Sequence, residues 1–179
     1  QWLSHTPHDC EERLAAQGEK GKKINPETKC FVYRNTELAL EWLSSQRRVM
    51  DREHAGWFLR FQSDVDGSAA EKCVAAGPCD GKHAFCCPFA DVYSENQVPW
   101  QGERQFGWNF LNKSLQDWWI ENFFFGRNGI DNPAVDGCFS DDVSGFPHEQ
   151  EDWVPRLGYS PAQTQELQIA TQHTWQRAF

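Results

Sequence analysis

Two adjacent acids, Asp141 and Asp142, follow a short apolar run and are the strongest candidates for chemistry in this chain. The run extends from Ala134 to Ser140, begins after the turn-forming pair Asn132-Pro133, and has the length of a buried strand. In α/β proteins the carboxyl ends of parallel strands carry the functional groups. Paired carboxylates at a strand end cost stability, because they repel each other and lose hydration. A functional role is therefore favoured over the two structural alternatives, which are a solvated loop and a helix cap.

Two carboxyls at one cleft can cleave a glycosidic bond, one as the acid and the other as the nucleophile or base. Alternation along the strand places Phe139 and Asp141 on one face and Asp142 on the other, and Asp141 ranks first. Because Asp142 is expected to point away, the second acid is sought at another strand end. Asp64, which follows a predicted strand, is the best local candidate, followed by Glu103 and Asp91, and the missing half of the barrel is at least as strong a source.

Polar and aromatic residues at other predicted strand ends are candidates for substrate binding. Tyr33, Arg34 and Asn35 end one strand, and Trp108 and Asn109 lie in another. The arginine could hold a carboxylate ionised or bind a substrate acid, and the other four could bind sugar hydroxyls and ring faces. For each of them a structural hydrogen bond or a place in the core is the alternative.

The elements that would position these residues alternate between strand and helix. We predict strands over 29–33, 57–62, 105–110 and 134–142, and helices over 36–50, 112–126 and 160–179. This order implies parallel strands with right-handed crossovers, which is about four βα units of a TIM-type (β/α) barrel. The sequence therefore predicts an α/β fold in which residues 1–179 form a single, partial barrel. Its open edges imply a fragment, or other chains that complete the barrel.

The segment 63–100 shows no periodic pattern and contains four of the seven cysteines. With no Cys-x-x-Cys pair in the chain, the spacing favours a disulfide-stapled insertion loop over zinc ligands or free thiols. An odd count leaves at least one thiol free or paired outside the chain. Disulfides and the sequon Asn112-Lys113-Ser114 are typical of secreted or lumenal glycoproteins. The chain begins at Gln1 without a signal peptide, so we expect a processed or partial chain.

Composition excludes several other classes of function. A net charge of −9 argues against nucleic acid and against anionic membrane surfaces as partners, and no apolar stretch is long enough to span a bilayer. The six histidines show no metal-ligand spacing, and no Gly-x-Ser-x-Gly motif is present. We therefore expect neither a metal nor a cofactor. Aromatic residues make up 14% of the chain, which is compatible with platforms for sugar rings as well as with core packing.

Three motifs together resemble a known group of proteins. They are Tyr33-Arg34-Asn35, the segment from Trp108 to Asn112, and the segment from Val135 to Asp142. In this order they are similar to secreted glycoside-hydrolase-like (β/α) barrels related to the polygalactosaminidase-like hydrolases, whose strands carry Asp-Gly-x-x-x-Asp signatures. The resemblance covers residues 25–179 and implies a TIM-type barrel. It also implies that Asp136, Gly137 and Asp141 are the signature positions, with Asp141 as the catalytic carboxylate.

Two hypotheses for function follow. The first is a secreted carbohydrate-active hydrolase that cleaves a glycosidic bond with strand-end carboxylates, and the acid pair and aromatic strand ends favour it. The second is a non-catalytic subunit that keeps the barrel scaffold and binds glycan or assembles with other proteins, which the short length and missing second acid favour. A second carboxyl about 5–10 Å from Asp141 across an open cleft would favour the hydrolase.

Overall fold

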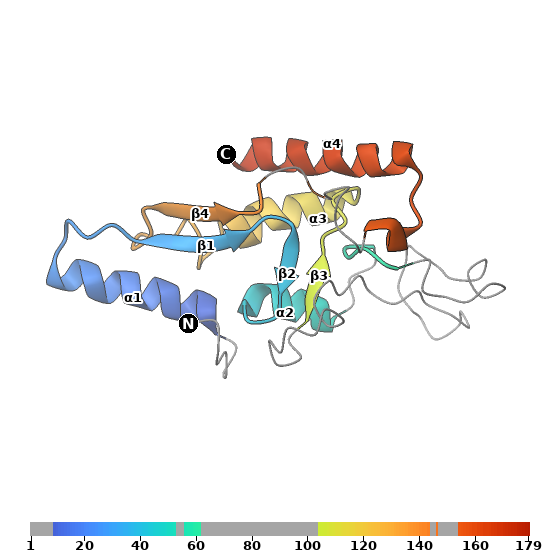
Figure 1. Cartoon of the computed structure of the whole chain (residues 1–179). Helices are drawn as coiled ribbons and strands as arrows, with labels where there is room; N and C mark the ends of the chain where they lie inside the picture. Colours follow the sequence, from blue (N-terminus) through green and yellow to red (C-terminus); the bar gives the residue numbers. More distant parts are fainter. Residues whose placement is uncertain (1–8, 53–55, 62–103, 144–145, 147–153) are drawn as a thin grey trace.

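The computed structural model describes residues 9–52, 56–61, 104–143, 146 and 154–179 (Figure 1). Asp64, Asp91, Glu103 and the cysteine-rich segment 63–100 lie outside these residues. The elements are α1 (Cys10–Ile24), β1 (Phe31–Asn35), β2 (Leu38–Leu40), α2 (Ser44–Asp51), β3 (Gln105–Gly107), α3 (Lys113–Trp118), the π-helix η2 (Trp119–Phe124), β4 (Gly137–Asp141), the 3-10 helix η3 (Val154–Leu157) and α4 (Pro161–Ala178).

The strands form two small sheets rather than part of a barrel. β1 pairs with β4 in parallel, from Phe31 opposite Gly137 to Asn35 opposite Asp141. β2 pairs with β3 in the antiparallel direction. The prediction of a TIM-type (β/α) barrel is therefore wrong for the described residues, in which four strands make one parallel and one antiparallel pair. The chain is a mixed α and β protein.

The barrel prediction failed at the residues that follow β1. The Asn35 side-chain oxygen accepts hydrogen bonds from the backbone N–H groups of Glu37 (3.0 Å) and Leu38 (2.7 Å), the pattern with which asparagine caps a helix. Here the same pattern makes a turn, and residues 38–40 continue as the buried strand β2. The predicted helix over 36–50 is thus reduced to α2, and β2 occupies residues where a crossover needs a helix.

The segments predicted as the second and third strands also pair in the antiparallel direction. Phe58 forms an isolated bridge with Trp108, and the N–H of Leu59 donates to the carbonyl of Gly107 at 2.9 Å. Residues 56–61 therefore lie along β3. This arrangement places the 57–61 segment next to β3, on the side of the molecule where β2 also lies, instead of in the β1–β4 sheet.

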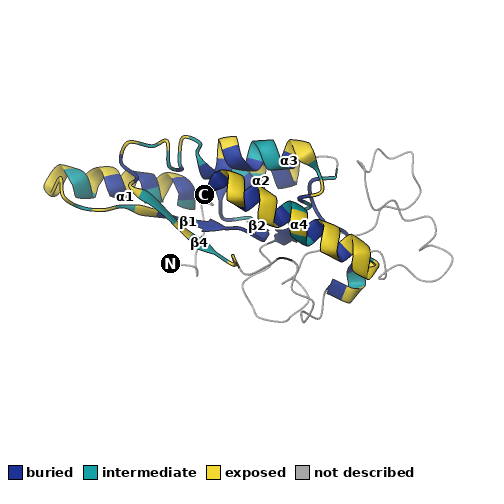
Figure 2. Cartoon of the chain, turned by 90° about the horizontal axis from the view of Figure 1, so that it is seen from above, coloured by how far each residue is buried: buried dark blue, intermediate teal, exposed yellow. Residues whose placement is uncertain are grey.

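Most of the aromatic residues form one core around β2, β3 and η2. Trp108 is fully buried and stacks on Phe58 at 5.2 Å between ring centroids, and Trp119 stacks on Phe124 at 5.6 Å. Figure 2 shows β2 entirely buried, whereas β1 and β4 also carry half-buried and exposed residues. The aromatic residues of the described ranges thus serve mainly the core, and the exposed exceptions are Phe31 on β1, Phe139 on β4 and Phe179 at the end of α4.

Two helix starts were correctly predicted from their capping residues. The Asn112 side chain accepts from the N–H groups of Ser114 and Leu115 at the start of α3. Ser160 and Gln163 form a capping box at the start of α4, with Pro161 in the first turn. α4 packs on η2, and α1 runs along β1 (Figure 1). α1 and η2 contact one face of the β1–β4 sheet, where Arg34 is buried, and Phe31 and Phe139 are exposed on the other.

Cys30 and Cys138 are free thiols, and no disulfide joins the cysteines within the described ranges. The predicted staple of the loop at 63–100 concerns cysteines outside those ranges and stays a prediction. Among the described helices, none combines the length and apolar content needed to cross a bilayer.

Candidate binding site at the ends of β1 and β4

The β1–β4 sheet has one covered and one open face. In a parallel pair, residues in register point to the same side, and alternate residues point to opposite sides. Val32 and Arg34 are completely buried on the covered face, beneath α1 and η2. On the other face Phe31 is 58% exposed and Phe139 is 60% exposed. Since parallel sheets are normally covered on both faces, this open face is unusual.

Three aromatic rings lie on the open face, which we define by Phe31, Tyr33 and Phe139. Tyr33 and Phe139 are register partners, and their rings stack with 6.1 Å between centroids and 26° between planes. Phe31 lies beside Gly137, where a Cβ atom would come within 3.0 Å of the Phe31 ring. Glycine at this position therefore lets the ring lie close against β4. The result is an exposed aromatic surface on two adjacent strands.

Polar groups follow the aromatic rings at the carboxyl end of the sheet, in a group we call the strand-end cluster: Tyr33, Asn35, Asp141 and Asp142. The Tyr33 hydroxyl donates to Asp141 Oδ2 at 2.9 Å. The Asn35 amide nitrogen donates to Asp142 Oδ2 at 2.6 Å and lies 3.3 Å from the Tyr33 hydroxyl. Three successive hydrogen bonds thus connect the two carboxylates, which lie in one cluster.

Asp142 joins the cluster because the backbone turns at this residue. Its φ is +59°, in the left-handed region that aspartate tolerates better than most residues. Thr36 holds the turn, with its hydroxyl 2.9 Å from the carbonyl oxygen of Asp141 and 2.7 Å from that of Asp142. The side chains of β4 alternate between the two faces of the sheet only as far as Asp141. The expectation that Asp142 points away from the Asp141 site is therefore not met.

The cluster also determines the protonation of Tyr33. Burial raises the pKa of the Tyr33 hydroxyl far above its usual value, and the negative charges of Asp141 and Asp142 raise it further, against the opposing effect of Asn35. Tyr33 therefore stays a hydrogen-bond donor at neutral and moderately alkaline pH. In these contacts both carboxylates accept hydrogen bonds. Such a site can bind hydroxyl or ammonium groups, which are donors.

The other predicted site residues lie elsewhere. Arg34 points to the covered face, where its guanidinium donates to the carbonyl oxygens of Phe123 (2.9 Å), Tyr33 (2.8 Å) and Asn128 (2.7 Å). Trp108 is buried in the core and offers no ring face to a ligand. The Asn109 amide donates to the carbonyl of Gly56 at 2.9 Å. The structure therefore brings together Tyr33, Asn35, Asp141 and Asp142.

Phe31 and Phe139 are site residues that the sequence analysis did not select. Alternation placed Phe139 on the same face as Asp141, and that signal was available. It did not show that this face is open, because exposure depends on how α1 and η2 pack. Among the described residues, no group of three or more histidine, cysteine or acidic side chains is arranged to hold a metal ion.

Comparison of the sequence with protein-family models and with curated proteins finds no match.

Proposed function

We propose that this protein binds carbohydrate, with the open face stacking against sugar rings and the strand-end cluster accepting hydrogen bonds from their substituents. The observation that carries the proposal is the pairing of an exposed aromatic surface with a polar cluster at its end. Stacked, exposed rings provide a flat apolar surface, and carboxylates and an amide provide orientation. We place the protein in the secretory pathway on the basis of its cysteines and sequon.

The charge of the cluster argues for a particular class of sugar. Asp141 and Asp142 repel uronic acids and attract neutral hydroxyl groups and, more strongly, protonated amino groups. The overall net charge of −9 acts in the same direction. We therefore propose neutral or amino sugars as ligands.

The test is calorimetric titration with glucosamine oligomers, neutral gluco-oligosaccharides and galacturonate oligomers. We expect binding of the first two classes and none of the third. Phe139→Ala should weaken binding about fivefold, because a stacked aromatic contact is worth on the order of 1 kcal/mol. The control is Ile169→Ala, which removes an exposed apolar side chain of α4. Equal affinity of wild type and Phe139→Ala for every bound sugar would contradict the proposal.

Hydrolysis is the second candidate function, because the two carboxylates of the strand-end cluster are joined through Tyr33 and Asn35. A hydrolase needs one protonated and one ionised carboxyl, with substrate between or beside them. The release of reducing ends from any bound oligosaccharide measures this activity. If hydrolysis occurs, Asp141→Asn should abolish it and leave the fold intact; activity that survives this change would exclude Asp141 as the catalytic carboxylate.

A further inference from the structure

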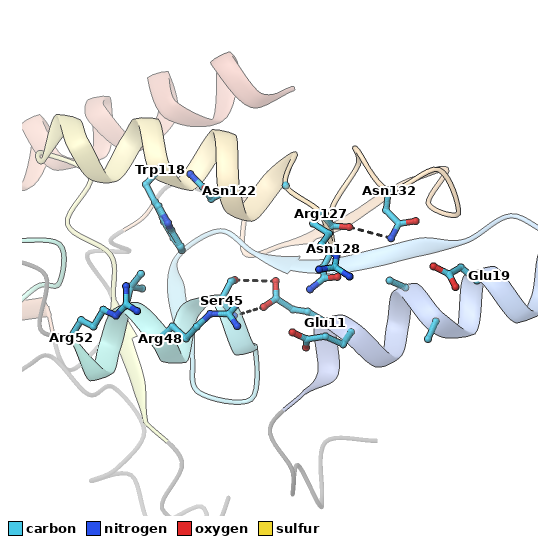
Figure 3. Close-up of a pocket in the computed structure, with 15 residues that line it drawn as sticks. Glu11, Glu19, Ser45, Arg48, Arg52, Trp118, Asn122, Arg127, Asn128 and Asn132 are labelled. Carbon is cyan, nitrogen blue, oxygen red and sulfur yellow. Dashed lines mark hydrogen bonds between the residues drawn. The ribbon is translucent and has the colours of Figure 1, made fainter.

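A polar groove lies on the side of the molecule where the helices cover the β1–β4 sheet. It has a volume of about 620 Å³ and is bordered by α1, α2, the end of α3 with η2, and the turn over 126–132. Figure 3 shows Arg48 on α2, Arg52 just after the end of α2, Arg127 on the turn, and Trp118 on the opposite wall from α2. We call it the arginine groove. It is separate from the open face, which lies on the other side of the sheet.

The three arginines of the groove differ from other arginines of the chain. Arg34, Arg104 and Arg177 each have a carboxylate partner. Within the described ranges, the guanidinium groups of Arg48, Arg52 and Arg127 have neither an ion pair nor a hydrogen bond. All three side chains are exposed, so water solvates their charges, and they are gathered around one groove of a chain whose net charge is −9.

The acids near the groove do not neutralise these arginines. Glu11 is buried and accepts hydrogen bonds from the Ser45 N–H (2.6 Å) and hydroxyl (3.0 Å), and it lies 3.9 Å from Arg34. Glu12 accepts from the Ser44 hydroxyl at 2.6 Å. In the view of Figure 3, Glu19 lies toward the end of the groove opposite Arg48 and Arg52. In the same view Arg48 and Arg52 lie together at one end of the groove, and Arg127 lies beside Asn128, between that end and Glu19. The end formed by Arg48 and Arg52 is therefore available to an anion.

Trp118 adds an apolar wall to this charged space. Its ring is half-buried and packs against Trp57 at 5.2 Å and Trp108 at 6.0 Å between centroids. These contacts restrict its movement, so one ring surface is held at the groove. A rigid aromatic wall beside arginines suits a ligand that has a ring and a negative group, because arginine binds oxyanions through several N–H donors.

From these observations we propose that the arginine groove binds a small molecule in which a ring is joined to an oxyanion, either a phosphate or a sulfate ester. The oxyanion binds to Arg48 and Arg52, and the ring packs against Trp118. This site is independent of the carbohydrate site on the open face.

The test is calorimetric titration of the full chain with phenyl phosphate, phenyl sulfate, inorganic phosphate and phenol at fixed ionic strength. We expect both phenyl esters to bind, inorganic phosphate to bind more weakly because it lacks the ring, and phenol not to bind. The relative affinities of the two esters distinguish a phosphate from a sulfate ligand. Phenol binding equal to that of the esters, or no binding of either ester, would overturn the proposal.

Variants then assign the binding to the groove. Arg48→Gln and Arg52→Gln should each weaken phenyl ester binding about tenfold, which is about 1.4 kcal/mol, because each removes a charge-assisted hydrogen bond to the oxyanion. Trp118→Leu should weaken phenyl phosphate more than inorganic phosphate. Arg177→Gln is the matched control, since it removes a surface arginine of α4 outside the groove. The proposal fails if this control loses as much affinity as the groove variants, or if the groove variants bind like wild type. Thermal unfolding of each variant confirms that it is folded.

Discussion

On the covered face of the β1–β4 sheet an arginine and a glutamate are buried together, whereas at the end of the open face a tyrosine and an aspartate are half-buried and a second aspartate is exposed. Arg34 is 0% exposed and Glu11 is 1% exposed, and each makes several hydrogen bonds to its surroundings. Asp142, in contrast, is exposed, and Phe31 and Phe139 beside the cluster are largely exposed. The two faces therefore use similar chemical groups in opposite environments.

This difference indicates which face stabilises the fold and which is available to a ligand. Arg34 joins β1 to η2 and to the turn at Asn128, and Glu11 joins α1 to the start of α2. Removal of either group leaves a buried partner unsatisfied. The aromatic rings of the open face leave much of their surface in water, so their removal costs little. If this comparison is right, substitutions on the covered face change stability, and substitutions on the open face change binding.

The largest effect is expected for Arg34→Leu. The variant leaves Glu11 buried without its cation and three carbonyl oxygens without their donor, which should lower the free energy of unfolding by about 3–5 kcal/mol. Urea denaturation measures it, with Arg177→Leu as the control for loss of a surface arginine. Should Arg34→Leu not fold, Arg34→Lys keeps the charge and should lose part of this stability. If Arg34→Leu and Arg34→Lys both unfold at the urea midpoint of the wild type, the covered face is not the face that stabilises the fold.

Glu11→Gln should have the next largest effect. The glutamine oxygen can still accept from the Ser45 N–H, but the charge that faces Arg34 is lost, and we expect a cost of about 2 kcal/mol. Urea denaturation again measures the change. The control is Glu19→Gln on the same helix, where the side chain is exposed and the cost should be negligible. If Glu11→Gln and Glu19→Gln have equal urea midpoints, the carbonyl oxygens that accept from the Arg34 guanidinium are sufficient to stabilise it without the charge of Glu11.

The sequence was sufficient to predict the local elements of this comparison. The apolar runs before Asn35 and Asp141 predicted β1 and β4, and the capping residues Asn112 and Ser160 predicted two helix starts. These signals are local, since they depend on residues within one turn or one strand. For the same reason Tyr33, Asn35, Asp141 and Asp142 could be selected as site residues.

The parts that were not predictable depend on contacts between distant residues. The hydrogen-bond pattern of Asn35 fits a helix cap and a turn equally, and pairing with β3 determines that β2 is a strand. Arg34 was assigned to the site although alternation separates it from Tyr33, because the sequence does not show which face is covered. Which face is covered is determined by η2 and α1, which contact Arg34 on the face opposite to Tyr33.

Tyr33→Phe tests whether a half-buried residue of the open face contributes to stability or to binding. The variant keeps the ring and removes the hydrogen bond to Asp141, which should cost about 1 kcal/mol because the hydroxyl is partly buried. Since the pKa of the Tyr33 hydroxyl is raised, the folded state binds this proton more tightly than the unfolded state does. Its contribution is therefore complete below the ordinary tyrosine pKa of about 10 and declines at higher pH.

Urea midpoints at several alkaline pH values measure this contribution. The control is Tyr159→Phe, which removes a phenol whose pKa is raised by burial alone. Loss of sugar binding in Tyr33→Phe with little loss of stability would assign the hydroxyl to the ligand. A loss of several kcal/mol would assign it to the core instead and weaken the comparison.

Asp136 supports the sheet from its exposed edge, and its effect should be smaller and confined to acid pH. Hydrogen bonds from the Lys22 ammonium and the Cys30 N–H, with the charges of Lys22 and Lys29, lower the pKa of this carboxyl to about 2. An unfolded aspartate titrates near pH 4, so the contribution is complete above about pH 4 and is lost as the pH falls toward 2. The stability difference between wild type and Asp136→Asn should narrow over this window, and Asp131→Asn is the control for the loss of an exposed carboxylate. A difference that is constant with pH would mean that the carboxylate charge is not involved.

Phe139→Ala should have the smallest effect on stability and therefore gives the sharpest contrast between the faces. The ring is 60% exposed, so its removal should change the free energy of unfolding by about 0.5 kcal/mol or less. Phe123, whose ring lies 4.6 Å from the Arg34 guanidinium on the covered face, is 0% exposed, and Phe123→Ala should cost about 3–5 kcal/mol. Urea denaturation of the two variants compares the same change in side chain in the two environments.

If Phe139→Ala loses sugar binding at almost no cost in the free energy of unfolding, the Phe139 ring contacts the ligand and does not stabilise the fold. A cost similar to that of Phe123→Ala would show that the open face is part of the core, and the carbohydrate proposal would lose its main support.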